Sequence, residues 1–155
     1  MYIEKKKYVS GLVSVITPVF NGERYIEETL RSLVQSDYAN LEFLVVDDGS
    51  NDESANLANA LLAASGRPYR LFSVENSGEA SADNLAFQHA RGEFVAVVNA
   101  DDPVMPSLFS ESVSALESNP ELVAVYPDWN MIDENGDLIR LIESKDYSLD
   151  LLIGD

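Results

Sequence analysis

Two pairs of aspartates each follow an apolar run of the chain and are the first candidates for chemistry. The pair at 47–48 comes directly after the run 41–46, and the pair at 101–102 comes soon after the run 94–98. Short apolar runs of this kind are typical of buried strands. Because open α/β sheets bind ligands at the carboxyl ends of their strands, we expect both pairs to lie in one acidic crevice.

Clustered carboxylates raise one another's pKa unless a positive charge lies between them. Mg²⁺ or Mn²⁺ would supply that charge, since both prefer oxygen ligands and complete their coordination with water and substrate phosphates. An acidic crevice can therefore bind a nucleotide diphosphate through a metal ion. The alternative is that the two pairs only form turns and helix caps. Their shared place after two strands favours the metal site.

Neighbouring backbone segments could complete such a pocket. The predicted strand 12–20 contains Pro18, which cannot donate to a strand ladder, so the chain already leaves the sheet there. Thr17, Pro18 and Val19 could then line the pocket beside a base or a ribose, with a plain turn as the alternative. Residues 76–81 precede a predicted helix, whose N-terminus could approach an anion.

The sequence lacks the residues that several classes of reaction need. The sequence has no cysteine, which excludes disulfides, zinc–thiolate sites and thiol nucleophiles. It has no glycine-rich dinucleotide or P-loop motif, and no serine in a nucleophile elbow. His89 is the single histidine, and we expect a surface or partly packed side chain. We expect Trp129 to be a hairpin or core aromatic rather than a sugar-stacking platform.

The composition describes one domain with a strongly acidic charge. The chain has 155 residues, 46% of them hydrophobic, and its 27 acidic and 10 basic residues give a net charge of −17. Nucleic acid and anionic membranes are therefore unfavourable partners. We interpret the basic patch at 4–7 as part of a solvated leader, 1–11, before a single domain, 12–155. The sequence shows no transmembrane stretch or signal peptide, which predicts a cytoplasmic protein, free or at the inner face of the membrane.

Short apolar runs alternate with segments of helical periodicity. In the first helical segment Ile26, Leu30 and Leu33 fall on one face. Residues 50–53, Ser-Asn-Asp-Glu, have the spacing of a capping box for the second helix. The alternation predicts an α/β fold with a mostly parallel sheet and helices on both faces. The predicted strands are 12–20, 41–47, 69–75, 94–99 and 121–126, and the predicted helices are 23–36, 53–65, 79–91 and 106–118.

A β-hairpin is predicted after this alternation. Residues 129–133 and 138–142 flank residues 134–137, Glu-Asn-Gly-Asp, and Asn-Gly is the strongest short hairpin signal. A new apolar segment then begins at 151–155, where the sequence stops. We interpret this as a truncated chain, the first portion of a larger domain.

Four motifs occur in a fixed order along the chain. They are VSVITPVFNG at 13–22, LVVDDGSND at 44–52, NSG at 76–78 with Asn84, and the segment 92–102 that ends in the second aspartate pair. Together they resemble family 2 glycosyltransferases of the GT-A fold over nearly the whole chain. The resemblance implies transfer of a sugar from a nucleotide-diphosphate donor, most often a UDP-sugar, with inversion at the anomeric carbon. It also implies assistance from Mg²⁺ or Mn²⁺.

The resemblance assigns roles to particular positions. Asp47 matches the aspartate that hydrogen-bonds the nucleotide base, and residues 17–19 match the first-strand residues beside the base and ribose. Residues 99–101 match the D-x-D motif, with Asp101 as the metal ligand and Asn99 as a neutral second ligand. The donor contacts that the resemblance implies are Thr17, Pro18, Val19, Asn21, Asp47, Asp48, Gly78, Asn84 and Ala100.

Two positions depart from the family's pattern. Asn99 replaces the first carboxylate of the D-x-D motif, which would weaken the hold on a metal ion. Asp83 stands where many relatives have an arginine before the asparagine that matches Asn84, and an acid there would repel phosphate. The family's catalytic base lies in an acceptor-binding half that follows the D-x-D region. We expect that base beyond Asp155 and identify no catalytic residue within this chain.

The leading interpretation is the donor-binding half of a bacterial glycosyltransferase that builds an envelope polysaccharide on a saccharide or lipid-linked acceptor. An apolar face left where the acceptor half would dock could form a homodimer. The alternative, favoured by Asn99 and Asp83, is a non-catalytic nucleotide-sugar-binding or interaction module on the same fold. A nucleotidyltransferase would need a glycine-rich, basic loop after the first strand, which this sequence lacks.

Overall fold

The computed structural model describes residues 7–133 and 135–144. Most of the expected leader, the turn residue Glu134 and the apolar segment 151–155 lie outside the described residues. The chain forms two compact units, 1–113 and 114–155, which are described separately. Among the described helices, none has the length and apolar character to cross a membrane.

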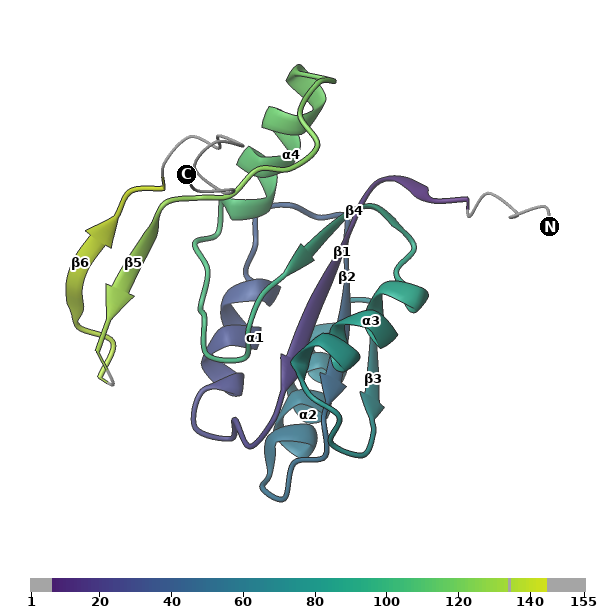
Figure 1. Ribbon diagram of the computed structural model, residues 1–155, viewed down its shortest axis with the longest axis vertical. Helices are drawn as coiled ribbons and strands as arrows, with labels where there is room; N and C mark the ends of the chain where they lie inside the picture. Colours follow the sequence, from purple (N-terminus) through teal and green to yellow (C-terminus); the bar gives the residue numbers. More distant parts are fainter. Residues whose placement is uncertain (1–6, 134, 145–155) are drawn as a thin grey trace, which may run out of the picture. The chain divides into compact units, whose positions relative to one another are not determined.

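A four-stranded parallel sheet forms the centre of the first unit (Figure 1). The order of its strands is β3-β2-β1-β4. This arrangement confirms the predicted parallel sheet, and the second predicted strand has the observed bounds. The strands are β1 (Val9–Val19), β2 (Leu41–Asp47), β3 (Tyr69–Ser73) and β4 (Gly92–Val97).

Helices cover both faces of this sheet, as the sequence predicts. Three helices, α1 (Ile26–Val34), α2 (Ser54–Ser65) and the start of α4 (Leu108–Ser118), contribute to the core on one face. The other face packs against α3 (Glu79–His89). The predicted stripe Ile26, Leu30 and Leu33 of α1 is fully buried, because it points into the first of these two cores.

Strand alternation explains how β1 and β2 serve both cores. Successive side chains of a strand point to opposite faces. Val15 and Phe43 belong to the core beneath α1 and α2, whereas Ile16 and Leu44 belong to the core beneath α3. A strand covered on both faces needs an apolar residue at nearly every position, which accounts for the continuous apolar runs.

The second unit contains the predicted hairpin, formed by β5 (Trp129–Ile132) and β6 (Leu138–Ile142), which pair antiparallel. Gly136 adopts φ +86° in the turn, a left-handed conformation that suits glycine. The Asp133 carboxylate accepts the backbone N–H groups of residues 135 and 137, and these bonds lower the pKa of Asp133. Trp129 is half-exposed on this hairpin, as expected for a hairpin aromatic.

The predicted strand at 121–126 is wrong. No strand forms at these described residues, and Leu122 and Val123 are both exposed. A strand needs a neighbour to satisfy its backbone groups, and within the described residues this apolar run pairs with none. Local apolar character was therefore not enough to determine the conformation.

Close approach between β1 and β4 requires a glycine at the start of β4. A Cβ atom on Gly92 would lie 2.5 Å from the Leu12 carbonyl oxygen and 2.7 Å from the backbone nitrogen of Ser14. We expect Gly92→Ala to lower the free energy of unfolding by about 3 kcal/mol, since backbone atoms cannot move aside as a flexible side chain can. Urea denaturation would measure this loss.

A matched control is Gly66→Ala. Gly66 has φ +68° but a Cβ there meets nothing within 4 Å, so only the backbone penalty of about 1 kcal/mol applies. Equal losses for the two variants would contradict the steric explanation at Gly92.

Candidate functional site

A cavity of about 370 Å³ lies at the carboxyl end of β1. Its walls come from the end of β1, the turn before α1, the residue after β2, the first residue of α3 and the loop after β4. This is the edge of the sheet where the sequence predicts the site. The lining residues are Pro18, Val19, Phe20, Asn21, Gly22, Tyr25, Asp48, Glu79, Asn99, Ala100 and Asp101.

Most of the predicted site residues meet at this cavity. Pro18, Val19, Asn21, Asp48 and Ala100 line it, and so do both predicted metal ligands, Asn99 and Asp101. The remaining predicted residues are not part of the lining: Thr17 and Asp47 are buried, Gly78 precedes α3, and Asn84 is exposed on α3.

Sequence reasoning missed four of the lining residues, namely Phe20, Gly22, Tyr25 and Glu79. Phe20 is 52% exposed and Tyr25 is 37% exposed, so part of each aromatic ring is open to solvent. Their only sequence signal is a place in the turn after the first strand. Gly22 belongs to the same turn, and a Cβ on it would lie 2.9 Å from Val19 and 3.6 Å from Ala100.

The two aspartates after β2 have different surroundings. Both side chains are buried, and they differ in the groups that they bind. The Asp47 carboxylate accepts the backbone N–H of Ser50 at 3.1 Å. The Asp48 carboxylate lines the cavity and accepts the N–H groups of Ser77 and Gly78, each at 2.8 Å. Asp48 therefore joins the end of β2 to the segment that begins α3, and Gly78 contributes to the site through this bond.

The turn before α1 is attached to the turn before α2 in both directions. Backbone N–H groups of residues 21–23 donate to side chains within 50–54, and two N–H groups of 50–54 donate back. Asn21 has φ +50°, and its side-chain oxygen accepts the N–H of Asn51 at 2.9 Å. Thus the Asn21 side chain holds the turn in place while the residue lines the cavity.

These bonds also replace the predicted capping box of α2. The Ser50 hydroxyl accepts the N–H of Asn21 at 2.9 Å, and α2 begins at Ser54 with no side-chain cap from Glu53. The Ser54 N–H donates instead to the carboxylate of Asp52 at 3.0 Å. The predicted capping box is therefore wrong. The Ser50 side chain, which would have served as the cap, is hydrogen-bonded to the neighbouring turn instead.

The cavity is acidic. Asp48, Glu79 and Asp101 line it, and the described residues of its wall include no lysine or arginine. The Asn99 amide nitrogen donates to Asp102 at 3.1 Å, so the carbonyl oxygen of Asn99 is the atom that suits a cation. Oxygen donors of this kind match Mg²⁺ or Mn²⁺.

A metal ion at this place would depend on ligands from outside the protein. Within residues 7–133 and 135–144, no group of three or more carboxylates or histidines could hold an ion. Asp101 and Asn99 therefore fit a hard cation that takes one or two protein ligands and completes its shell with water and substrate phosphates.

Asp83 carries an unsatisfied carboxylate oxygen on α3. Its Oδ1 atom is buried and, among the residues that the structure describes, has no hydrogen-bond partner. Burial raises the pKa of Asp83, and the negative charge of Glu79 raises it further. The acid noted as a departure from the family's pattern is thus electrostatically unfavourable in its ionised form.

The family model described as glycosyl transferase family 2 matches residues 14–148. Among curated proteins, glycosyltransferase GlyG of Streptococcus pneumoniae is 26% identical over 144 residues, covering 93% of this chain and 48% of GlyG. O-antigen biosynthesis protein RfbC of Myxococcus xanthus is 34% identical over 145 residues, covering 91% of this chain and 11% of RfbC. This chain thus spans about half of one relative and a small part of the other.

Solved structures show the same fold. Residues 1–349 of S. aureus TarS in complex with UDP-GlcNAc match with a TM-score of 0.65 and 30% identity, over 69% of this chain and 31% of that TarS chain. The mannosyltransferase PcManGT of Pyrobaculum calidifontis, in complex with GDP-Man and Mn²⁺, matches with a TM-score of 0.66 and 30% identity, over 71% of this chain and 33% of PcManGT. The chain has the GT-A fold and belongs to glycosyl transferase family 2.

Proposed function

We propose that this chain carries the donor site of an inverting glycosyltransferase that transfers a sugar from a UDP-sugar to a saccharide or lipid-linked acceptor. The observation that carries the proposal is the cavity itself, which brings Asp48, Asn99 and Asp101 together from separate parts of the sequence. The complexes of TarS with UDP-GlcNAc and of PcManGT with GDP-Man support a nucleotide-sugar ligand. The relative named for O-antigen biosynthesis supports a role in bacterial polysaccharide assembly.

Asp48 is the carboxylate that we assign to the nucleotide base. The family resemblance assigns this role to Asp47, but of the two only Asp48 lines the cavity. Each Asp48 oxygen accepts one backbone N–H and keeps a second lone pair, which can accept an N–H from a base. Pro18 and Val19 with the exposed aromatic rings of Phe20 and Tyr25 offer apolar surface to the flat base.

Asp101 and Asn99 are the residues that would hold Mg²⁺ or Mn²⁺. When bound, such an ion acts as a Lewis acid that neutralises the departing nucleoside diphosphate. Without a cation, the carboxylates of Asp48, Glu79 and Asp101 would repel a diphosphate, and no basic side chain of the described lining would offset them.

Transfer with inversion also requires a general base that removes the proton of the acceptor hydroxyl as it attacks. We assign no residue of this chain to that role, and its place beyond Asp155 stays a prediction. A non-catalytic nucleotide-sugar-binding module is the second candidate function. Asp83 favours only the form of this alternative that binds another partner in place of a nucleotide sugar, an interaction module, since an acid on α3 opposes a phosphate ligand.

Calorimetric titration of UDP, GDP and dTDP, with and without Mn²⁺, tests the donor site. We expect UDP to bind only with Mn²⁺, and Asp101→Ala to weaken that binding at least about tenfold because it removes the charged metal ligand. Glu111→Ala, which removes an exposed acid on α4 that is not in the cavity lining, is the control and should leave the affinity unchanged. Equal UDP affinity in the presence and absence of Mn²⁺ would contradict the proposed metal role.

Asp83 gives the chain a pH dependence whose sign follows from its raised pKa. The carboxyl has a pKa of about 4 in the unfolded chain and a higher pKa in the folded chain. Between these two values the folded state binds more protons than the unfolded state, so stability falls as pH rises. We expect Asp83→Asn to melt at a higher temperature than the native chain at pH 7, and the two to converge below about pH 4.

The same substitution should strengthen Mn²⁺-dependent UDP binding at pH 7, because it removes a negative charge from α3. Asp37→Asn serves as the control, since Asp37 is exposed and outside the cavity lining. A stabilisation by Asp83→Asn that persists unchanged well below about pH 4 would show that charge is not its cause.

A further inference from the structure

Two carboxylates from the region of β2 hold the two ends of α3. Asp48, just after β2, binds the N–H groups of residues 77–78, directly before the helix. Glu42, near the start of β2, binds the backbone N–H of Arg91 at 2.8 Å, two residues after the helix ends. Leu44 and Val46, between the two acids, belong to the core that packs against α3.

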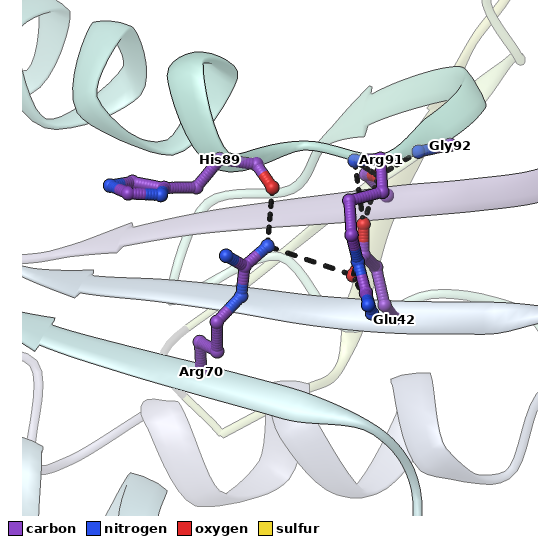
Figure 2. A network of polar contacts seen from close by, with 6 residues as sticks. Glu42, Arg70, His89, Arg91 and Gly92 are labelled. Carbon is purple, nitrogen blue, oxygen red and sulfur yellow. Dashed lines mark hydrogen bonds and ion pairs between the residues drawn. The ribbon is translucent and has the colours of Figure 1, made fainter. Parts of the chain in front are cut away.

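Glu42 is the centre of a buried ionic network (Figure 2). Its side chain is 1% exposed, and Oε2 accepts from Arg91 Nε at 2.9 Å and Nη2 at 2.7 Å. Oε1 accepts from the Ser14 hydroxyl at 2.7 Å. Burial alone would raise the pKa of Glu42, but the hydrogen bonds from Ser14 and Arg91 and the Arg91 charge lower it, so the carboxylate is ionised.

A second arginine connects this network to the last residue of α3. Arg70 of β3 donates to the His89 carbonyl oxygen, and its Nη2 lies 3.8 Å from Glu42 Oε2. Figure 2 shows Arg70 reaching both groups. The His89 ring stacks on Phe72 with ring centroids 4.7 Å apart. These contacts attach the C-terminal end of α3 to the sheet.

We propose that Glu42 is a positioning residue for the donor cavity, acting through α3. The first residue of α3, Glu79, lies in the cavity wall, and the helix has 11 residues. A helix of that length spans about 16 Å. Its near end is held by Asp48, and the attachment of its far end through Glu42 restricts how the whole helix can tilt and therefore where Glu79 lies. This inference rests on the proposed donor site for its functional consequence.

Hydrogen–deuterium exchange and UDP titration of Glu42→Gln test this role. The substitution keeps the shape of the side chain but removes the charge that pairs with Arg91. We expect faster amide exchange over residues 77–84, at the cavity end of α3, and a fall of about fivefold in Mn²⁺-dependent UDP affinity, measured well below the melting temperature. A role in stability alone would lower the melting temperature without changing the affinity.

The control is Glu27→Gln, which breaks the exposed ion pair of Glu27 with Arg31 on α1 and should change neither measurement. Arg70→Gln is a milder variant if Glu42→Gln does not fold, because it keeps the Glu42–Arg91 pair. We expect it to shift exchange at residues 77–84 in the same direction and by less.

The outcomes separate this inference from the proposed function. Exchange changes confined to residues 89–92, with unchanged UDP affinity, would overturn the positioning role while leaving the donor site intact. If the native chain binds no nucleotide, the proposed function fails, and the exchange at residues 77–84 alone decides whether Glu42 positions α3.

Discussion

Burial of β1 and β2 on both faces is the constraint on which the rest of the structure depends. Every residue of β2 is buried, and so is β1 from Leu12 to Val19. Polar groups along such strands must be fully hydrogen-bonded, since unpaired buried groups are costly. Acidic side chains therefore occur either at the strand ends, as Asp48 does, or inside a complete ionic network, as Glu42 does. The cavity and the attachment of α3 both result from this restriction.

The fold was predictable where burial determines which positions of the sequence are apolar. The run at 41–47 has an apolar residue at nearly every position because helices cover both of its faces, and its predicted bounds match β2. The hairpin was predictable from Asn135-Gly136, because the left-handed turn needs glycine. The prediction of a strand at 121–126 was wrong because a strand also requires a neighbouring strand, and a local sequence pattern does not show whether one is present.

The sequence predicted which strand ends and loops surround the cavity better than it predicted which individual side chains line it. Residues after parallel strands meet at one edge whatever their side chains, which is why the predicted residues Asp48, Asn99 and Asp101 line one cavity. The choice between Asp47 and Asp48 depends on which face each side chain takes, and the sequence places the two side by side. Phe20 and Tyr25 were missed because exposure of an aromatic ring is a tertiary property. The partners of Ser50 lie in another turn, about which a local capping rule says nothing.

The bonds between the turns at 21–23 and 50–54 limit how this part of the chain can vary in length. Each turn supplies donors and acceptors that the other needs, at fixed positions. An insertion in one turn would leave backbone groups of the other without partners, unless the second turn changed with it. Surface turns usually tolerate insertion well. In these two turns, however, the length of each is coupled to the length of the other, and the cavity wall keeps its shape only if neither length changes.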